Sequence, residues 1–363
     1  MEKAAVYIIN SLQNGGAERV VLTQADALLE RGIKVFIILL RDLSMYDYDD
    51  RIEIIKLTDK KEFSKIQYFT QVYPLVKKIN AKLAMLYEKY DIVLLSSHLL
   101  YPNFIMRLTS YTKKCMYVMH CSFFIVPYAK SRLFKWFVQW LYGKQQVVCV
   151  GEGVLSEMKD YFGMHQASLC AIVNPLDFDK IDVKLQEDFT PYEHPYLLFC
   201  GRLTSAKRVD RLLEVFYNGG FYHTHHLVLL GIGELEEDLK EQVRAYGIEE
   251  QVYFAHWQEN PFQWMKHADL FVLTSDYEGL AMVLLEALYC GCRIVAVDCP
   301  HGPNEIMVDE LKPYLCKADS KDIIEKIQLA LYTYPTSLRR YTARFHIDRH
   351  IQTYLDTYAK WNE

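Results

Sequence analysis

The chain contains the stretch Ser275-Asp276-Tyr277-Glu278-Gly279-Leu280-Ala281-Met282-Val283-Leu284-Leu285-Glu286-Ala287-Leu288, which joins a predicted buried strand over residues 269–274 to a predicted helix over 281–290. Glu278 and Gly279 fall on the turn between them. Such a turn offers free N–H groups and the positive end of a helix dipole, and it therefore binds anions. Glu278 and Glu286 can each accept hydrogen bonds from a pair of hydroxyls such as those of a sugar. The alternative is an ordinary turn with one solvated and one structural glutamate.

The pattern of apolar runs predicts an α/β protein. Strands are expected over 4–10, 34–40, 52–56, 91–96, 114–120 and 146–150, with helices over 18–31, 68–90, 101–110, 130–143 and 153–162. The alternation then restarts, with strands over 195–200, 226–230, 251–255, 269–274 and 293–298 and helices over 208–217, 235–246, 261–267, 281–290 and 302–307. Two Rossmann-like, doubly wound domains facing a central cleft are therefore expected, with ligands at the carboxyl ends of the strands.

The domain boundaries follow from breaks in this pattern. The first domain is expected over residues 1–174, a linker over the charged, proline-bounded segment 175–194, and the second domain over 195–345. The last segment, 346–363, is expected to form a helix that packs back toward the first domain.

The composition is that of a globular protein. The 363 residues are 51% apolar and 24% charged, which allows two domains of the usual size. The first residues predict a short strand rather than a signal peptide. Nine cysteines show neither zinc-ligand spacing nor a disulfide framework, which fits a reducing cytoplasm. No Asp-x-Asp triplet or His/Cys cluster stands out, so no metal ion is expected, and neither a further cofactor nor a nucleic-acid partner is predicted.

The charge is distributed unevenly along the chain. Residues 1–174 hold 22 Lys and Arg against 16 Asp and Glu, and the remainder holds 19 against 30. Residues 92–151 include no acidic residue, which suggests an anionic neighbour. The segment from Lys130 to Lys144 combines basic residues with an apolar stripe that includes Trp136 and Trp140, as in helices that lie on an anionic membrane. The alternative is that both tryptophans face the domain core.

Glycines and cations follow other predicted strands. Gly15 and Gly16 open the helix after the first strand, where adjacent glycines permit positive φ and let phosphates approach the backbone, although such a pair is also typical of a plain turn. Their spacing matches neither a dinucleotide motif nor a P-loop, which argues against NAD and ATPase chemistry. Arg202 and Lys207 follow the strand over 195–200, and two cations there suit a diphosphate. His120 ends the strand over 114–120, where a structural histidine is the usual case.

Together these motifs resemble the family 4 retaining glycosyltransferases of the GT-B fold. The resemblance rests on Gly15-Gly16-Ala17-Glu18, His120, Asn174-Pro175, Gly201-Arg202 with Lys207, Gly231-Ile232-Gly233, Asn260-Pro261-Phe262, the Glu278/Glu286 pair and Cys299-Pro300-His301-Gly302-Pro303-Asn304-Glu305-Ile306. These positions span nearly the whole chain, and those of the second domain are the more specific. The resemblance implies transfer of a hexose or N-acetylhexosamine from a nucleotide diphosphate sugar, with UDP as the expected nucleotide, with retained anomeric configuration and without a metal ion.

The resemblance also implies a role for each matched residue. Arg202 and Lys207 would hold the diphosphate, Glu286 the ribose, and Glu278 and His120 hydroxyls of the donor sugar, with Glu278 as a positioning group rather than a nucleophile. The other donor-binding residues would be Gly15, Gly16, Asn174, Gly231, Gly279 and Leu280. The stretch 96–103 matches no recognisable acceptor class, and its His98 and Asn103 are the candidates for binding the acceptor.

The expected function is extension of a cell-surface polysaccharide or lipopolysaccharide on a glycan or lipid-linked acceptor, at the inner face of the cytoplasmic membrane. Two alternatives use the same fold. A non-catalytic sugar-nucleotide-binding protein would bind the donor without turning it over, and a sugar-nucleotide epimerase would interconvert donors with no acceptor present.

Overall fold

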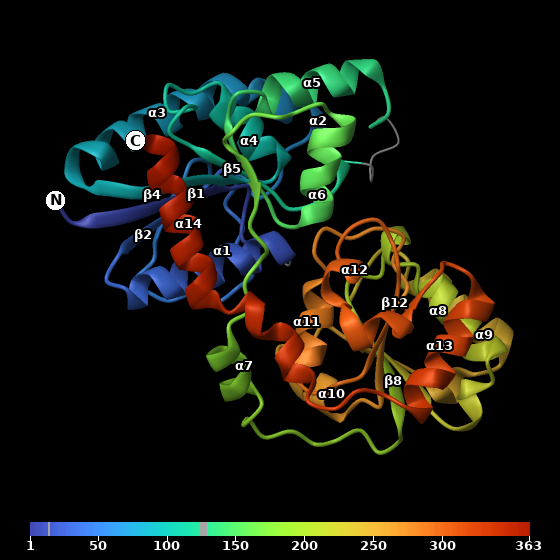
Figure 1. Cartoon of the computed structure of the whole chain (residues 1–363). Helices are drawn as coiled ribbons and strands as arrows, with labels where there is room; N and C mark the ends of the chain where they lie inside the picture. The colour runs from blue at the N-terminus through green and yellow to red at the C-terminus, as the bar shows by residue number, and fades with distance from the viewer. Residues whose placement is uncertain (14, 124–128) are drawn as a thin grey trace. The chain divides into compact units, whose positions relative to one another are not determined.

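The computed structural model describes residues 1–13, 15–123 and 129–363 and divides the chain into two compact units. Unit 1 comprises Met1–Pro175 together with Ile347–Glu363, and unit 2 comprises Leu176–His346. The chain therefore returns to unit 1 with its last helix, which is drawn in red in Figure 1.

Unit 1 is built on a seven-stranded sheet in the order β3-β2-β1-β4-β5-β6-β7, in which every neighbouring pair is parallel. The strands are β1 Lys3–Ile9, β2 Lys34–Leu39, β3 Glu53–Lys56, β4 Asp91–His98, β5 Met116–Met119, β6 Gln146–Cys149 and β7 Leu169–Ala171. The central strand β1 is buried from Ala4 to Ile9, because helices cover both faces of a parallel sheet.

The helices of unit 1 are α1 Gly16–Glu30, α2 Lys65–Thr70, α3 Val72–Lys89, α4 Leu100–Arg107, α5 Arg132–Tyr142, α6 Glu152–Ser156 and α14 Ile347–Asn362. Helices α1 and α14 cover one face of the sheet, and α3, α4 and α5 cover the other (Figure 1). This division follows from right-handed crossovers that run in opposite directions from the central strands. Two hydrogen bonds anchor α14: its His350 contacts the side chain of Gln24 in α1 at 2.6 Å and donates to the carbonyl of Val173 at 2.8 Å.

Unit 2 repeats the design with a six-stranded parallel sheet in the order β10-β9-β8-β11-β12-β13. The strands are β8 Tyr196–Cys200, β9 His226–Leu230, β10 Val252–His256, β11 Leu270–Leu273, β12 Ile294–Val297 and β13 Leu315–Cys316. The helices are α7 Phe178–Lys184, α8 Val209–Asn218, α9 Glu236–Tyr246, α10 Pro261–His267, α11 Met282–Tyr289, α12 Pro303–Ile306 and α13 Ser320–Tyr332. The predicted fold class of two doubly wound α/β domains is confirmed.

Several local predictions differ from the structure. The single helix expected over 68–90 is two helices, α2 and α3, separated at Gln71, and α2 begins at a capping box of Ser64 and Gln67. The helix expected over 153–162 changes at Glu157 into a π-helix. The segment expected as a linker over 175–194 includes α7, whose N-cap Asp177 accepts a bond from the backbone N–H of Lys180. Strands β7 and β13 were missed because each has only two or three residues at a sheet edge.

Each sheet has one point at which the strand order changes direction, between β1 and β4 in unit 1 and between β8 and β11 in unit 2. Ligands of open α/β sheets bind beside such a point, at the carboxyl ends of the strands. At the first point, Gly15 follows β1 and His98 ends β4. At the second point, Lys207 follows β8 and Glu278 follows β11. The topology therefore gathers the predicted site residues into two half-sites, one in each unit.

Candidate active site

The half-site of unit 2 is centred on an ion pair between Lys207 and Glu278. The Nζ of Lys207 lies 2.5 Å from Oε1 of Glu278, and the hydroxyl of Ser275 donates to the same oxygen at 2.6 Å. Both charged side chains are mostly buried, with 21% and 10% of their surface exposed. The second carboxylate oxygen, Oε2, accepts no hydrogen bond from any residue that the structure describes. Glu278 is therefore held through one oxygen and has the other available for a ligand.

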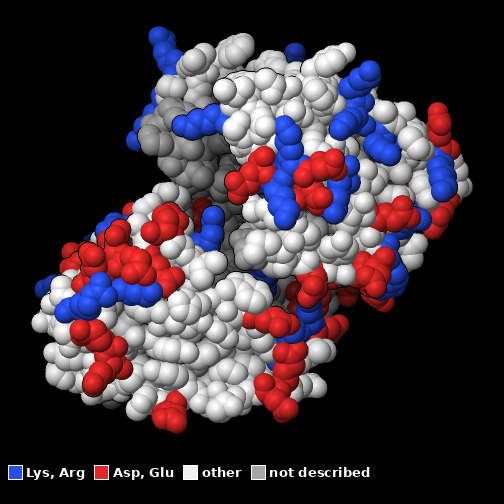
Figure 2. Space-filling model, turned by 180° about the vertical axis from the view of Figure 1, so that it is seen from behind, with Lys and Arg blue, Asp and Glu red and all other residues white. Residues whose placement is uncertain are grey.

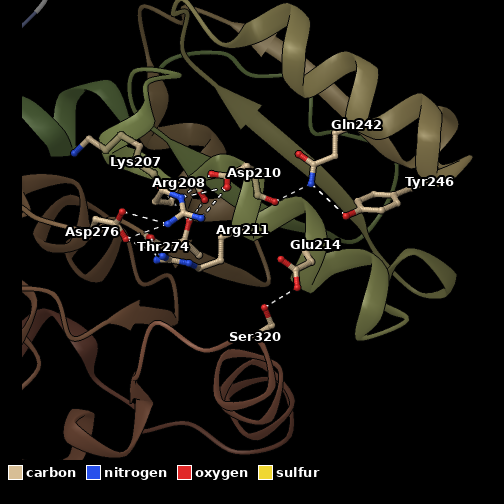
Figure 3. Close-up of polar contacts among 10 residues, drawn as sticks. All are labelled: Lys207, Arg208, Asp210, Arg211, Glu214, Gln242, Tyr246, Thr274, Asp276 and Ser320. Carbon is tan, nitrogen blue, oxygen red and sulfur yellow. Dashed lines mark hydrogen bonds and ion pairs between the residues drawn. The ribbon is translucent and has the colours of Figure 1, made fainter.

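A second ion-pair network braces the loop that carries Glu278 (Figure 3). Arg211, in α8 and nearly buried, donates to Oδ1 of Asp276 at 2.7 Å and to the carbonyl of Thr274 at 2.9 Å. Arg208 donates to Oδ2 of Asp276 at 3.2 Å from a left-handed backbone conformation with φ 50°. Figure 3 shows Lys207 pointing away from these arginines. The backbone turn at Arg208 thus separates the cation that meets Glu278 from the cations that hold Asp276.

The turn after Glu278 presents unused backbone donors. The N–H groups of Gly279 and Leu280 donate to no acceptor among the described residues, and α11 begins just beyond them. Gly302 packs against this turn: a Cβ there would lie 3.2 Å from Cβ of Glu278, and its φ of 88° also favours glycine. Glu286 lies buried further along α11. Open N–H groups at a helix start are the feature on which the prediction of an anion-binding turn rests.

Arg202 and the glycines near it have different roles. Arg202 is exposed and forms no ion pair within the part of the chain that is described, so its guanidinium is open to solvent. Gly231, with φ 135°, packs so tightly on the backbone of Gly201 that a Cβ would overlap it, and Gly233 packs on Leu203 in the same way. These two glycines therefore allow their own backbone to pack directly against the backbone of the loop that carries Arg202. In this structure Gly231 contacts protein backbone.

The half-site of unit 1 begins at Gly15 and Gly16. Gly15 is the N-cap of α1 with an extended backbone, φ −135°, and neither glycine has positive φ, so the expectation of positive φ here is wrong. The carboxylate of Glu18 lies against Gly15, where a Cβ would overlap it. Gly16 has open space where a Cβ would point. A phosphate could thus approach the backbone at Gly16. Asn14, quoted beside them in the motif's turn, lies outside the described residues.

His120 follows β5 and is bonded to a buried histidine of the neighbouring strand. Nε2 of His120 lies 2.9 Å from Nδ1 of His98, and Nε2 of His98 lies 3.0 Å from the hydroxyl of Ser96. Burial lowers the pKa of His120 to about 4. Burial, together with the nearby His120 and His350, holds the pKa of His98 well below its usual value. Both imidazoles are therefore neutral at physiological pH.

The two acceptor candidates from the sequence lie inside unit 1. His98 and Asn103 have no exposed surface, and the amide of Asn103 donates to the carbonyl of Val118 and the hydroxyl of Tyr142. Neither can touch an acceptor in this structure, which corrects the expectation of direct contact. Asn174 is also buried. The sequence could not separate these cases, because a His at a strand end and an Asn in the following helix are equally compatible with a ligand site and with a hydrogen-bonded core.

Helix α5 divides the predicted aromatic stripe. Leu133 and Trp136 are 76% and 62% exposed, whereas Trp140 packs against Phe104 and under the guanidinium of Arg107. Two further exposed apolar side chains, Ile66 and Phe69, lie on α2, which the sequence did not single out.

An aromatic chain links α2 to α5. Tyr68 contacts Tyr101, Tyr101 contacts Phe104, and Phe104 contacts Phe137. Helices α2 and α5 thus flank α4 on one face of the sheet.

Figure 2 shows the charge of the molecule from behind, with acidic side chains gathered mostly on unit 2 and isolated basic ones at the upper left of unit 1.

Two further properties concern metals and membranes. In residues 1–13, 15–123 and 129–363, no group of three or more His, Cys, Asp or Glu side chains is arranged to hold a metal ion. No helix within these ranges has the length and apolarity needed to cross a bilayer.

Family profiles match most of the chain. The profile described as Glycosyltransferase Family 4 matches residues 14–180, and the one described as Glycosyl transferases group 1 matches residues 181–344. The chain is 26% identical over 335 residues to the Campylobacter jejuni N-acetylgalactosamine-N,N'-diacetylbacillosaminyl-diphospho-undecaprenol 4-alpha-N-acetylgalactosaminyltransferase, covering 89% of this chain and 88% of that protein. It is 29% identical over 152 residues to the lipopolysaccharide 1,6-galactosyltransferase of Salmonella typhimurium, covering 40% and 41%.

Solved structures share the fold at low sequence identity. Anabaena HepE, crystallised with UDP and glucose, superposes with a TM-score of 0.77 at 18% identity, covering 98% of this chain and 99% of that one. Two family profiles match the chain, and the predicted motifs lie at the switch points of its two parallel sheets. These findings together assign the chain to a family. The chain is a family 4 glycosyltransferase with the GT-B fold.

Proposed function

We propose that the enzyme transfers a hexose or N-acetylhexosamine from a nucleotide diphosphate sugar, with retention of anomeric configuration and without a metal ion. The observation that carries this proposal is the Lys207–Glu278 pair beside the open amides of Gly279 and Leu280. A cation and free N–H groups suit a diphosphate, and the available Oε2 of Glu278 suits a sugar hydroxyl. One small turn therefore offers both kinds of group that a sugar nucleotide requires.

In this proposal Arg202 and Lys207 bind the two phosphates. Arg202 is solvent-exposed and can reach a ligand without breaking an existing ion pair of the described residues. Lys207 is held by Glu278, so diphosphate binding would share its ammonium between the carboxylate and a phosphate oxygen. Glu286 accepts bonds from the ribose hydroxyls, and His120 donates to an oxygen of the sugar. UDP is the nucleotide of choice because HepE was crystallised with it.

The chemistry assigned to these groups is electrostatic. The bond between the anomeric carbon and the diphosphate oxygen breaks, positive charge develops on the sugar, and negative charge develops on the leaving phosphate. Fixed cations and helix-start amides stabilise that negative charge. The acceptor oxygen attacks from the face that the diphosphate leaves, and its proton passes to a phosphate oxygen. Glu278 orients the sugar in this scheme and forms no covalent bond.

We further propose a lipid-linked or glycan acceptor of cell-surface polysaccharide or lipopolysaccharide synthesis, met at the inner face of the cytoplasmic membrane. The names of the Campylobacter jejuni and Salmonella typhimurium relatives support this acceptor class. Exposed Leu133 and Trp136, with Lys130 and Arg132 beside them, provide an apolar and cationic surface on α5 that suits anionic headgroups. Ile66 and Phe69 of α2, on the other side of α4, are also exposed apolar side chains.

A panel of nucleotide sugars tests the donor assignment. The cognate donor at 100 times its dissociation constant adds about 2.7 kcal/mol of apparent stability, which thermal unfolding detects. The stabilising donor is then incubated with and without lipid-linked acceptors, and the anomeric configuration of the product is determined by NMR. An inverted product contradicts retention. Interconversion of donors without an acceptor indicates an epimerase, and binding without turnover across acceptors indicates a binding protein.

A further inference from the structure

The pair His98 and His120 determines how His120 can meet a ligand. His120 stands after β5 at the carboxyl edge of the sheet, half-buried, with Nε2 turned to His98 at 2.9 Å. Its Nδ1 makes no hydrogen bond to a described residue and is not one of the fully buried, unpaired polar atoms. Nδ1 is therefore the ring nitrogen that faces solvent or a ligand.

The hydrogen atoms of the chain can be assigned by counting donors and acceptors. Ser96, His98 and His120 share two contacts, and Ser96 and His98 are completely buried. If His98 carried its proton on Nε2, it would donate to Ser96, and the hydroxyl hydrogen of Ser96 would then have no acceptor in the described part of the chain. Leaving a buried donor unsatisfied disfavours that arrangement roughly tenfold or more.

The opposite assignment satisfies every side-chain polar atom of the buried Ser96 and His98. The hydroxyl of Ser96 donates to Nε2 of His98, Nδ1–H of His98 donates to Nε2 of His120, and His120 carries its own proton on Nδ1. Neither ring takes up a second proton near neutral pH, because burial lowers both pKa values. The ring of Tyr7, at 5.6 Å from that of His98, closes the site on the inner side.

We infer that Ser96 and His98 form a buried positioning chain that holds His120 as the Nδ1–H tautomer, so that His120 presents one fixed, uncharged N–H donor to an oxygen acceptor on the ligand. In water histidine favours the Nε2–H form, so the protein selects the less common one. His98 acts through His120 and does not contact the substrate. The contact between Nδ1–H and a donor-sugar or phosphate oxygen rests on the proposed function, whereas the tautomer itself does not.

The tautomer can be measured directly. Long-range ¹H–¹⁵N spectra of the full-length protein labelled with ¹⁵N-histidine at pH 7.5 separate the Nδ1–H and Nε2–H forms, and His120→Gln and His98→Asn assign the two signals. We expect both histidines as Nδ1–H in the wild type. His98→Asn should leave His120 as Nδ1–H, because the asparagine amide takes the place of the Nδ1–H donor. His98→Leu should convert His120 largely to Nε2–H or to a mixture.

Activity gives the second readout. At comparable melting temperatures, His98→Leu should lower transfer about tenfold or more, and His98→Asn should remain within a few-fold of the wild type. Nε2–H on His120 in the wild type overturns the inference, as does an unchanged His120 tautomer in His98→Leu. If His98→Leu does not fold, Ser96→Ala replaces it and must shift the His98 signal away from pure Nδ1–H. Failure to transfer any sugar with the tautomers as stated contradicts the proposed function and leaves the positioning chain intact.

Discussion

Arg211 and Asp276 are joined by a 2.7 Å ion pair in which Nη2 of Arg211 donates to Oδ1 of Asp276, two residues before Glu278. Arg211 is nearly buried, and its other terminal nitrogen holds the carbonyl of Thr274. The pair therefore ties α8 to both ends of the segment between β11 and the candidate catalytic turn. The pair holds in place the segment that carries Glu278.

Replacing Asp276 by Asn should test this support. The charge-assisted bonds to Arg208 and Arg211 weaken, so we expect a loss of about 1 to 3 kcal/mol in the free energy of unfolding and about tenfold lower kcat/KM. Urea unfolding and a steady-state assay measure the two effects. Asp210→Asn is the matched control, since among the described residues the side chain of Asp210 forms its salt bridge with Arg208 and none with Arg211. If the two variants behave alike in both measurements, the brace is not specific to Asp276.

Removing either predicted diphosphate cation should be far more damaging to catalysis. Arg202→Ala and Lys207→Ala are each expected to slow transfer by two or more orders of magnitude, which corresponds to roughly 2.7 to 4 kcal/mol for one preorganised donor to a developing anion. Lys266→Ala removes an exposed lysine of the same unit and serves as the control. Near-normal activity in a folded Arg202 or Lys207 variant would refute the diphosphate assignment.

Chelators should leave transfer unchanged. In the proposed mechanism the two cations and the amides of Gly279 and Leu280 perform the charge neutralisation that a divalent ion performs in other transferases. Initial rates with EDTA, and then with added magnesium or manganese, measure this. A strict requirement for either ion, with acceptor solubility controlled, would exclude the metal-independent mechanism.

Membrane binding should depend on the surface of α5. Replacing Lys130, Arg132 and Lys135 by Ser should weaken sedimentation with anionic vesicles, because each nearby basic residue contributes about 1 kcal/mol that salt screens. Replacing Leu133 and Trp136 by Ser should also weaken sedimentation with vesicles, and the size of this loss should not depend on the salt concentration. The control is the same charge change at Lys266, Lys312 and Lys321 in unit 2. If vesicle binding is unchanged by both sets of α5 substitutions and by the salt concentration, the docking surface lies elsewhere.

Stability should fall as the solution is acidified below about pH 6.5, the ordinary histidine pKa. Burial lowers the pKa of His120 and of His350 to about 4, and it lowers that of His98 as well. Between about pH 6.5 and 4 the unfolded chain therefore binds protons that the folded protein does not, and each such group contributes up to about 1.4 kcal/mol per pH unit.

His350→Gln checks the sign of this dependence. The variant removes one buried imidazole from the α14 anchor, so its free energy of unfolding should fall less steeply with acidification than that of the wild type. Equal slopes for His350→Gln and the wild type would show that His350 does not titrate in this window.

The alternation of strands and helices, the restart of the pattern in the second unit and the strand-to-helix turn at Glu278 could all be predicted from the order of residues alone. These features are local: apolar runs, glycines and helix starts report on neighbouring residues. The sequence also predicted Arg202, Lys207, Glu278 and His120 as site residues, because each lies beyond the carboxyl end of a strand of a parallel sheet. The short edge strands and the helix break at Gln71 were not predicted, because each involves too few residues to produce a recognisable hydrophobic pattern.

Which of these side chains contact each other depends on how distant segments pack. Lys207 and Glu278 are 71 residues apart in the chain, and Arg211 and Asp276 are 65 apart, so no spacing rule pairs them. Burial also could not be predicted from the sequence. His98, Asn103 and Asn174 were candidate ligand contacts but lie inside unit 1. Trp136 and Trp140 share one apolar stripe but differ in exposure. Polar residues become ligand contacts or core according to which strands become neighbours, and the order of strands in a sheet is set by packing between distant segments.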